Sequence, residues 1–272
     1  MKFSVLISAY HTEIPANLER ALKSIWDDQF LKPDEIVLVK DGQLTKDLDF
    51  LIETWSKRLH GIIKVIELKK NVGLGSALGI GIKECKYGII ARMDTDDISL
   101  PHRFLTQMSY LEKNKNIQLL GAHISEFEFS ENTILRSRKV PLTHENILKK
   151  SKFSNPFNHP VVVYRKTAVL NAGGPINFTD FDDYFLWIRM LMNGYKTANI
   201  DDVLLLMRTG NGLIKRRSGL KYVNQEWKFQ NKLLKIGFIN HFVFGLNLIR
   251  RIPIRLFPSR IIKIVYKLIL RK

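Results

Sequence analysis

Cysteine and long hydrophobic runs are both scarce in this chain of 272 residues. Cys85 is the only cysteine, so no disulfide bond can form within the chain, which suits a reducing compartment. A membrane-spanning helix needs about 18 consecutive apolar residues. The nearest candidate, residues 236–249, is interrupted by Asn240, His241 and Asn247. The sequence therefore predicts no transmembrane helix.

Acidic residues are scarce in the last quarter of the chain. Residues 203–272 contain 16 Lys or Arg and a single acid, Glu226, whereas residues 1–202 contain 27 basic and 25 acidic residues. Nearly all of the formal net charge of +17 therefore lies near the C-terminus. This asymmetry predicts a nearly neutral domain over residues 1–210 and a basic, helical membrane-association region over residues 211–272.

The last residues have the pattern of a basic amphipathic helix. In residues 260–272, Lys263, Lys267 and Arg271 recur every four residues, and apolar side chains fill most other positions. This pattern is typical of helices that lie in a membrane interface. Packing or contact with a partner is one alternative. Nucleic acid is another, but few aromatic side chains stand among the cations to stack on bases. We expect an anionic membrane surface as partner and no nucleic acid. Further cations that would add about 1 kcal/mol each at such a surface are Arg250, Arg251, Arg255 and Arg260.

The first hundred residues alternate between apolar runs of strand length and segments of helical period. Because the runs are hydrophobic on both sides, they indicate a mostly parallel sheet with helices on both faces, an α/β fold. The predicted strands are residues 3–10, 35–42, 62–70 and 87–94, and the predicted helices are residues 17–30, 45–61 and 74–85.

The pattern after residue 100 is mixed, and the C-terminal part is expected to pack on the core. A helix is predicted over residues 101–114, a strand over 117–129 that pairs with residues near 134–140, a strand over 159–165, a turn at 173–174, a helix near 183–193 and a final strand over 201–208.

Polar residues follow several of the predicted strands. Asp41, Asn71 with Gly73, and the aspartates of residues 94–97 all come directly after strand ends. Ligands of parallel sheets bind beyond the carboxyl ends of the strands. We therefore expect these residues to line one crevice.

The stretch ARMDTDDIS, residues 91–99, places Asp94, Asp96 and Asp97 within four positions. One interpretation is helix capping by Asp97 or Ser99. It does not explain Asp94 and Asp96, which share a side if the segment is extended. Two hard oxygen ligands on one side suit Mg²⁺ or Mn²⁺ bound to a diphosphate, which is the other interpretation.

Three further segments have two interpretations each. Glycines in residues 71–81 resemble a dinucleotide-binding loop, but the spacing is one residue too long, so close helix–strand packing is favoured. Asp183 begins a predicted helix and is either a carboxylate favoured by the helix dipole or a general base. The run IKRRSG, residues 214–219, is either an exposed loop or a phosphate clamp.

Five segments in order resemble the family 2 glycosyltransferases of the GT-A fold, above all bacterial enzymes of exopolysaccharide, O-antigen and capsule biosynthesis, such as those of amylovoran type. SVLISAYH resembles the opening strand and VLVKDG the nucleotide-binding strand. NVGLGSALGIGI resembles the Asn-x-Gly segment, ARMDTDDIS the DXD motif, and DDYFLWIRM the Glu-Asp-Tyr-x-Leu-Trp-x-Arg segment. The resemblance extends over residues 1 to about 210.

The resemblance implies a role for each candidate residue. Asp183 would be the general base that deprotonates the acceptor hydroxyl, and Asp96, with Asp94, would bind Mn²⁺ or Mg²⁺. The nucleotide-sugar site would comprise Tyr10, Glu13, Asp41, Asn71, Gly73, Arg92 and Asp94. The acceptor or a diphosphate would contact His159, Asp182, Arg216 and Arg217.

The implied function is inverting transfer of a single sugar from a nucleotide-sugar donor, UDP-linked by expectation, to a polyprenyl-diphosphate-linked saccharide. The enzyme would be peripheral on the inner, cytoplasmic face of the cytoplasmic membrane. The chain departs from the family in having Asp182 where Glu is usual, and in lacking a His shortly after Arg208. It also lacks the Gln-x-x-Arg-Trp motif of processive enzymes. The alternatives are a nucleotidylyltransferase and a non-catalytic basic binding module with a degenerate nucleotide site.

Overall fold

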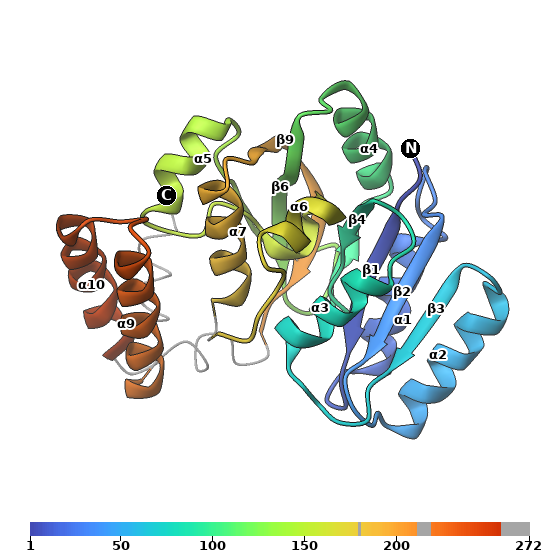
Figure 1. Ribbon diagram of the computed structural model, residues 1–272. Coiled ribbons are helices and arrows are strands. Elements are labelled where there is room, and N and C mark those ends of the chain that lie inside the picture. The colour runs from blue at the N-terminus through green and yellow to red at the C-terminus, as the bar shows by residue number, and fades with distance from the viewer. Residues whose placement is uncertain (179–180, 211–218, 257–272) are drawn as a thin grey trace.

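A nine-stranded sheet runs through the molecule and carries helices on both faces (Figure 1). Figure 1 shows the computed structural model, which describes residues 1–178, 181–210 and 219–256. The strand order is β3-β2-β1-β4-β8-β6-β9-β5, and β7 pairs with β6. The strands are β1 Ser4–Ala9, β2 Glu35–Lys40, β3 Ile63–Glu67, β4 Ile89–Arg92, β5 Ile98–Ser99, β6 Ile117–Phe127, β7 Ile134–Arg138, β8 Val163–Arg165 and β9 Lys196–Arg208.

Parallel pairing dominates the sheet, as predicted. Strands β3, β2, β1 and β4 are mutually parallel, and so are β6 and β9. Strand β8 is antiparallel to both of its neighbours, β4 and β6. The carboxyl ends of β1, β2 and β4 therefore meet at one edge, which is where a ligand site is expected.

The helices divide between the two faces because the central strands are apolar on both sides. Residues Val5 and Ile7 of β1 face one core, and Leu6 faces the other. The first face is covered by α1 Pro15–Ile25, α2 Lys46–Arg58 and α4 Arg103–Lys113. The second is covered by α3 Leu74–Glu84, α5 His144–Ser151, α6 Lys166–Asn171 and α7 Asp182–Met192.

The predicted elements are present, with shifts at their ends. The first helix begins at Pro15, because proline is pre-shaped for the first helical position. The predicted strand over residues 159–165 is shorter, since His159–Val161 form a 3₁₀ turn before β8. The predicted pairing of residues 117–129 with residues near 134–140 is confirmed by β6 and β7.

Two C-terminal helices pack on the core through α7. They are α9 Leu220–Lys235 and α10 His241–Leu256, which lie together at one end of the molecule (Figure 1). Phe229 of α9 stacks on Phe181, with ring centroids 4.7 Å apart, and it also contacts Tyr184. The expectation of a packed C-terminal part is thus confirmed. The amphipathic pattern of residues 260–272 lies outside the described residues.

Within the described part of the chain, none of the helices has both the length and the apolar character needed to span a membrane.

Candidate active site

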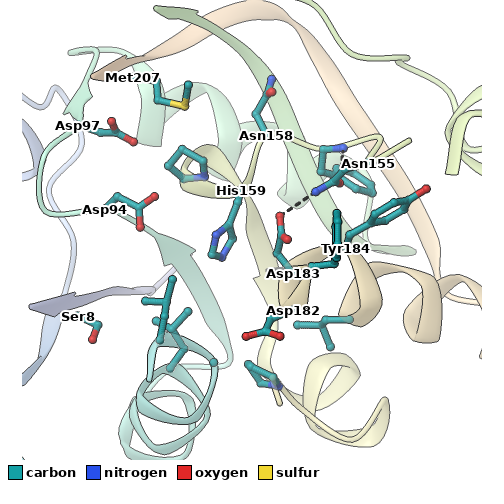
Figure 2. Close-up of a pocket in the computed structure, with 18 of the residues that line it drawn as sticks. Ser8, Asp94, Asp97, Asn155, Asn158, His159, Asp182, Asp183, Tyr184 and Met207 are labelled. Atoms are coloured by element: carbon teal, nitrogen blue, oxygen red, sulfur yellow. Dashed lines mark hydrogen bonds between the residues drawn. The ribbon is translucent and has the colours of Figure 1, made fainter. Parts of the chain in front are cut away.

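A cavity of about 1530 Å³ opens at the carboxyl ends of β1, β2 and β4 (Figure 2). Apolar side chains and three kinds of polar side chain line it. Carboxylates come from the loops after the strands and from the start of α7, amides come from several segments including the one before β8, and cations come from α5, α10, β7 and the end of β9. The structure thus brings together most of the predicted site residues: Tyr10, Glu13, Asp41, Asn71, Gly73, Asp94, Asp96, His159, Asp182 and Asp183. Arg216 and Arg217 lie outside the described residues.

The segment after β4 is a turn rather than the extended stretch that the sequence suggested. Thr95 and Asp96 form the turn, and Asp94 and Asp96 are half-buried in the cavity wall. Asp97 is buried, and its Oδ1 accepts a hydrogen bond from the backbone N–H of Arg208 at 2.8 Å. Asp97 therefore joins the turn to the end of β9.

The capping interpretation of this segment is wrong. The residue before α4 is His102, and no side chain caps that helix. Ser99 belongs instead to the short strand β5, and its N–H donates to Oγ of Ser24 at 3.0 Å. The three aspartates are thus held by β4 and β9, not by the helix that follows.

The clustered carboxylates repel one another. Burial raises the pKa of Glu13, and the charges of Asp96 and Asp94 raise it further, against a hydrogen bond from Thr95. Burial likewise raises the pKa of Asp97 well above its ordinary value, and the charges of Asp94 and Asp96 add to this. A cation bound at this end of the cavity would relieve the repulsion.

Two buried arginines support the turn from behind. Arg92, predicted to contact the nucleotide sugar, is only 1% exposed and donates to the carboxylate of Asp94 and to the backbone oxygen of Leu6. Arg103 is fully buried and donates to the backbone oxygens of Arg92 at 2.6 Å and Pro160 at 3.2 Å. Burial lowers the pKa of Arg103 to about 9. Arg92 therefore orients Asp94 from beneath the cavity wall.

Asp41 organises the glycine loop that precedes α3. Its two carboxylate oxygens accept the backbone N–H groups of Val72 at 2.7 Å and Gly73 at 3.1 Å. Gly73 has φ +84°, which favours glycine. Asn177 closes the loop from the other side by accepting from the N–H of Ser76 at 2.9 Å. The start of α3 is thus linked to the segment that precedes α7.

The predicted role of the other glycines in helix packing is confirmed at Gly81. A Cβ there would lie 2.5 Å from Cδ1 of Leu6 and 2.8 Å from Cγ2 of Val39. Helix α3 therefore approaches β1 and β2 more closely than any side chain at this position would allow.

Asp182 and Asp183 occupy the first turn of α7 and have different partners. Oδ1 of Asp182 accepts the backbone N–H of Phe178 at 2.6 Å, so this carboxylate shapes the segment before the helix. Oδ2 of Asp183 accepts from Nδ2 of Asn155 at 2.7 Å and faces the cavity (Figure 2). The helix dipole favours both carboxylates. The side-chain amide of Asn155 fixes the orientation of Asp183.

His159 lies between Asp94 and Asp183 (Figure 2). Burial lowers its pKa, as does the neighbouring charge of Arg92, while Asp183 and Asp94 act in the opposite direction. The ring of Trp187 lies 6.2 Å from the imidazole, measured between centroids. A neutral imidazole can donate to or accept from a sugar hydroxyl.

The residues fit a divalent metal whose coordination shell is completed by the substrate. Within the described ranges, no group of three or more His, Cys, Asp or Glu side chains could hold a metal alone. Asp94 and Asp96 nevertheless offer hard oxygens at the cavity wall, beside carboxylates whose mutual repulsion a cation would offset. The remaining ligands would be diphosphate oxygens and water.

Several residues of the cavity were not predicted from the sequence. Asn155 and Asn158 lie on either side of Pro156 and Phe157, in the same segment as His159. Their two amides close to a histidine were the sequence signal that could have indicated a site. Arg250 and Arg251 were assigned to a membrane surface, yet both line the cavity. Arg251 is moreover paired with buried Glu226, so it is no free surface cation.

Comparison with known proteins agrees with this geometry. The sequence profile of glycosyl transferase family 2 matches residues 4–173. A protein of Escherichia coli named UDP-Gal:alpha-D-GlcNAc-diphosphoundecaprenol beta-1,3-galactosyltransferase is 37% identical over 271 residues, covering 100% of this chain and 97% of that protein. The amylovoran biosynthesis glycosyltransferase AmsE of Erwinia amylovora is 38% identical, covering 97% and 98%.

Solved structures share the fold at lower identity. Residues 1–349 of TarS from S. aureus, in complex with UDP-GlcNAc, align with a TM-score of 0.65 and 17% identity, covering 86% of this chain and 67% of that one. The mannosyltransferase PcManGT of Pyrobaculum calidifontis, in complex with GDP-Man and Mn²⁺, aligns with a TM-score of 0.64 and 15% identity, covering 91% and 68%. These likenesses show the GT-A fold. Together with the profile match and the relatives of 37% and 38% identity, they identify the chain as a glycosyltransferase of family 2.

Proposed function

We propose that this glycosyltransferase moves one sugar, with inversion, from a UDP-linked donor to a saccharide carried on a polyprenyl diphosphate. The observation that supports this most is the arrangement of carboxylates in one cavity. Asp94 and Asp96 line the cavity from the segment after β4, and Asp183, oriented by Asn155, lines it from α7. Figure 2 shows Asp94 and Asp183 on opposite sides of His159. A donor diphosphate and an acceptor hydroxyl would thus have separate carboxylates.

The transfer step follows from this separation. Asp183 accepts the proton of the acceptor hydroxyl as its oxygen attacks the anomeric carbon of the donor sugar. The bond between that carbon and the phosphate oxygen breaks, and its electron pair leaves with the nucleoside diphosphate. Because attack and departure occur on opposite faces, the anomeric configuration inverts. Asn155 orients the carboxylate through a single 2.7 Å bond.

The donor site would use the strand-end residues. Asp41 and the loop of Asn71 and Gly73 would hold the nucleoside, with Tyr10 and Glu13 beside it. Mn²⁺ or Mg²⁺, when bound by Asp96 and Asp94, would neutralise charge on the departing diphosphate. Support for the donor class comes from the complexes of structural neighbours with UDP-GlcNAc and with GDP-Man and Mn²⁺.

The lipid-linked acceptor is suggested by the name of the Escherichia coli relative, which specifies a diphosphoundecaprenol. Such an acceptor is presented at a membrane, and residues 211–272 would bring the enzyme to the inner face of the cytoplasmic membrane. Among the described residues, α10 exposes Phe242 at 77% and Ile249 at 73%, seven positions apart and thus on one helix face. Apolar side chains on a basic helix suit an anionic lipid surface.

Calorimetric titration with UDP, GDP and their sugars tests the donor half of this proposal. We expect binding of UDP compounds with Mn²⁺ or Mg²⁺, its loss in chelator, and its loss in Asp96→Ala but not in the surface control Asp47→Ala. Transfer from the bound sugar nucleotide to a sugar-diphosphate alkyl acceptor tests the other half. Absence of nucleotide binding under every condition would overturn the proposal in favour of a binding module.

A further inference from the structure

The cavity has cations on the side away from the sheet. In Figure 1, α7 lies between the strands β1 and β2 on one side and α9 and α10 on the other. Asp94, Asp96 and Asp97 line the cavity from the strand side, together with Arg138 of β7 and Arg208 of β9, whereas Lys150 of α5 and Arg250 and Arg251 of α10 line it from the helical side. A diphosphate bound through a metal by the aspartates leaves Lys150 and Arg250 without a ligand in the proposed function.

Arg251 is held by a buried polar network. Its Nη1 donates to the carboxylate of Glu226, and its Nη2 donates to the backbone oxygen of Phe153. Gln230 donates to the same carboxylate at 3.0 Å, and Asn247 donates to Gln230 at 2.9 Å. Glu226 is fully buried, and the side chain of Arg251 is 17% exposed. The guanidinium is thus fixed at the cavity wall before any ligand binds.

The same network attaches α10 to the end of α5. Asn247 donates from Nδ2 to the backbone oxygen of Lys152 at 2.9 Å, and Arg251 holds the next residue, Phe153. Lys150 stands in the last turn of α5, two residues before Lys152. Its exposed ammonium and the exposed guanidinium of Arg250 therefore face one cavity from two helices that are fixed to each other.

The location of these cations matches the geometry of the proposed acceptor. Phe153, which Arg251 holds, is two residues before Asn155, whose amide binds Asp183. In an acceptor that carries a single sugar, as the name of the Escherichia coli relative specifies, the hydroxyl that Asp183 would deprotonate and the diphosphate are separated by one sugar ring. Asp183 and the cations line the same cavity, and residues 153–155 connect their partners.

We propose that Lys150, Arg250 and Arg251 form a second diphosphate site, which binds the diphosphate of the lipid-linked acceptor without a metal. The guanidinium fork of Arg250 binds phosphate oxygens in pairs, and the ammonium of Lys150 adds a point charge. Arg251, already paired with Glu226, contributes its remaining N–H groups. The enzyme then holds two diphosphates in one cavity by different chemistry. The donor's is bound through a metal on carboxylates, and the acceptor's is bound directly by cations. This inference rests on the proposed function for the identity of the ligand, but not for the existence of the site.

Titration with inorganic diphosphate in the presence of chelator tests the site alone, because the donor site needs its metal. We expect wild-type protein to bind diphosphate under these conditions. Arg250→Ala and Lys150→Ala should each weaken binding about tenfold, the loss of one charge-assisted contact. Asp96→Ala should bind diphosphate as wild type does. Arg251→Ala is not used, since it would leave Glu226 buried and unpaired with a cation.

Matched controls come from the same helical region. Lys149 is the exposed neighbour of Lys150 on α5, and Lys228 is exposed on α9. Neither belongs to the cavity wall. Lys149→Ala and Lys228→Ala remove the same net charge, so they should bind diphosphate as wild type does. Equal losses in the controls would show a general charge effect and overturn the site.

Kinetics with two soluble acceptors identify the source of the diphosphate. For a sugar-diphosphate alkyl acceptor, Arg250→Ala and Lys150→Ala should raise KM about tenfold, and Arg250→Lys should recover part of the loss. For the alkyl glycoside that lacks the diphosphate, KM should not change, and neither should the Kd of the donor with Mn²⁺. A raised donor Kd would instead assign the cations to the donor and overturn the proposal.

Three further outcomes also test the proposed second diphosphate site. Reduced sedimentation with anionic vesicles, at unchanged KM for the soluble acceptor, would assign the cations to lipid headgroups and overturn the proposal. Absence of diphosphate binding to the wild-type protein in chelator would also overturn the proposal. If diphosphate binds through Lys150 and Arg250 but no sugar is transferred, the second site stands and the proposed function fails.

Discussion

Asn155 donates a hydrogen bond of 2.7 Å from Nδ2 to Oδ2 of Asp183, and both side chains line the cavity. The bond joins the segment before β8 to the first turn of α7. Asn155 occupies one oxygen of Asp183, and in the proposed function the other oxygen would accept the proton of an acceptor hydroxyl. The structure thus distinguishes Asp183 from Asp182, whose Oδ1 is used by the backbone of Phe178.

Asp183→Asn should abolish transfer while the donor still binds. A positioned general base contributes about 10²–10⁴ in rate, so kcat should fall by that factor, and the Kd of the nucleotide sugar should not change. Asn155→Ala should lower kcat about tenfold, because it removes only the orienting bond. Radiolabelled transfer and calorimetry measure the two quantities. Asn146→Ala, on the exposed face of α5, is the control. An Asp183→Asn variant that keeps most of its turnover would remove Asp183 as base.

Asp41→Asn should weaken donor binding through the loop of residues 71–73. The substitution replaces one carboxylate oxygen, which now accepts a backbone N–H, with an amide NH2 group that cannot accept it. Leaving a partly buried N–H unpaired costs about 1–3 kcal/mol, so the Kd for the nucleotide should rise tenfold or more. Asp47→Asn, on the surface of α2, should bind as wild type does. Unchanged affinity in Asp41→Asn would show that the loop does not contact the donor.

Gly81→Ala and Gly245→Ala should change stability in opposite directions. At Gly81 the added methyl would overlap Leu6 and Val39, and overpacking of this kind costs about 1–3 kcal/mol. At Gly245, in α10, a Cβ meets no described heavy atom within 4 Å, so the gain in helix propensity of about 0.5–1 kcal/mol remains. Urea unfolding measures both. A neutral Gly81→Ala would mean that α3 can move away from the sheet.

His144 should make stability depend on pH below neutrality. Its Nδ1 accepts the backbone N–H of Thr197 at 3.3 Å, and burial, followed by the charge of Lys196, lowers its pKa. A base with a depressed pKa in the folded state stabilises the fold above its unfolded pKa, and this stability is lost as pH falls through the folded pKa. The loss should be under about 1 kcal/mol, because solvent reaches the ring.

Comparing the free energy of unfolding at pH 7.5 and pH 5 checks this. His144→Asn should reduce the difference between the two pH values, whereas His60→Asn, at an exposed position, should leave it as in wild type. An equal pH dependence in wild type and His144→Asn would contradict the prediction.

The sequence by itself determined the layered α/β architecture and the location of the strand side of the cavity. Apolar runs such as residues 35–40 can be buried on both faces only in a sheet covered by helices, and parallel strands must bring their carboxyl ends together. Asp41, Asn71 and Asp94 follow strand ends, so their convergence was predictable from chain order alone.

Only the tertiary structure decided which partners these groups have. Asp97 binds the backbone of Arg208, 111 residues away, and no local pattern indicates that pairing. Arg251 resembles the other basic residues of the C-terminal quarter in sequence, but in the structure it pairs with buried Glu226 at the cavity wall. Local periodicity fixes secondary structure and strand ends, because it depends on neighbouring residues. Hydrogen bonds and ion pairs between distant segments depend on how helices such as α10 pack, and that is set by the whole core.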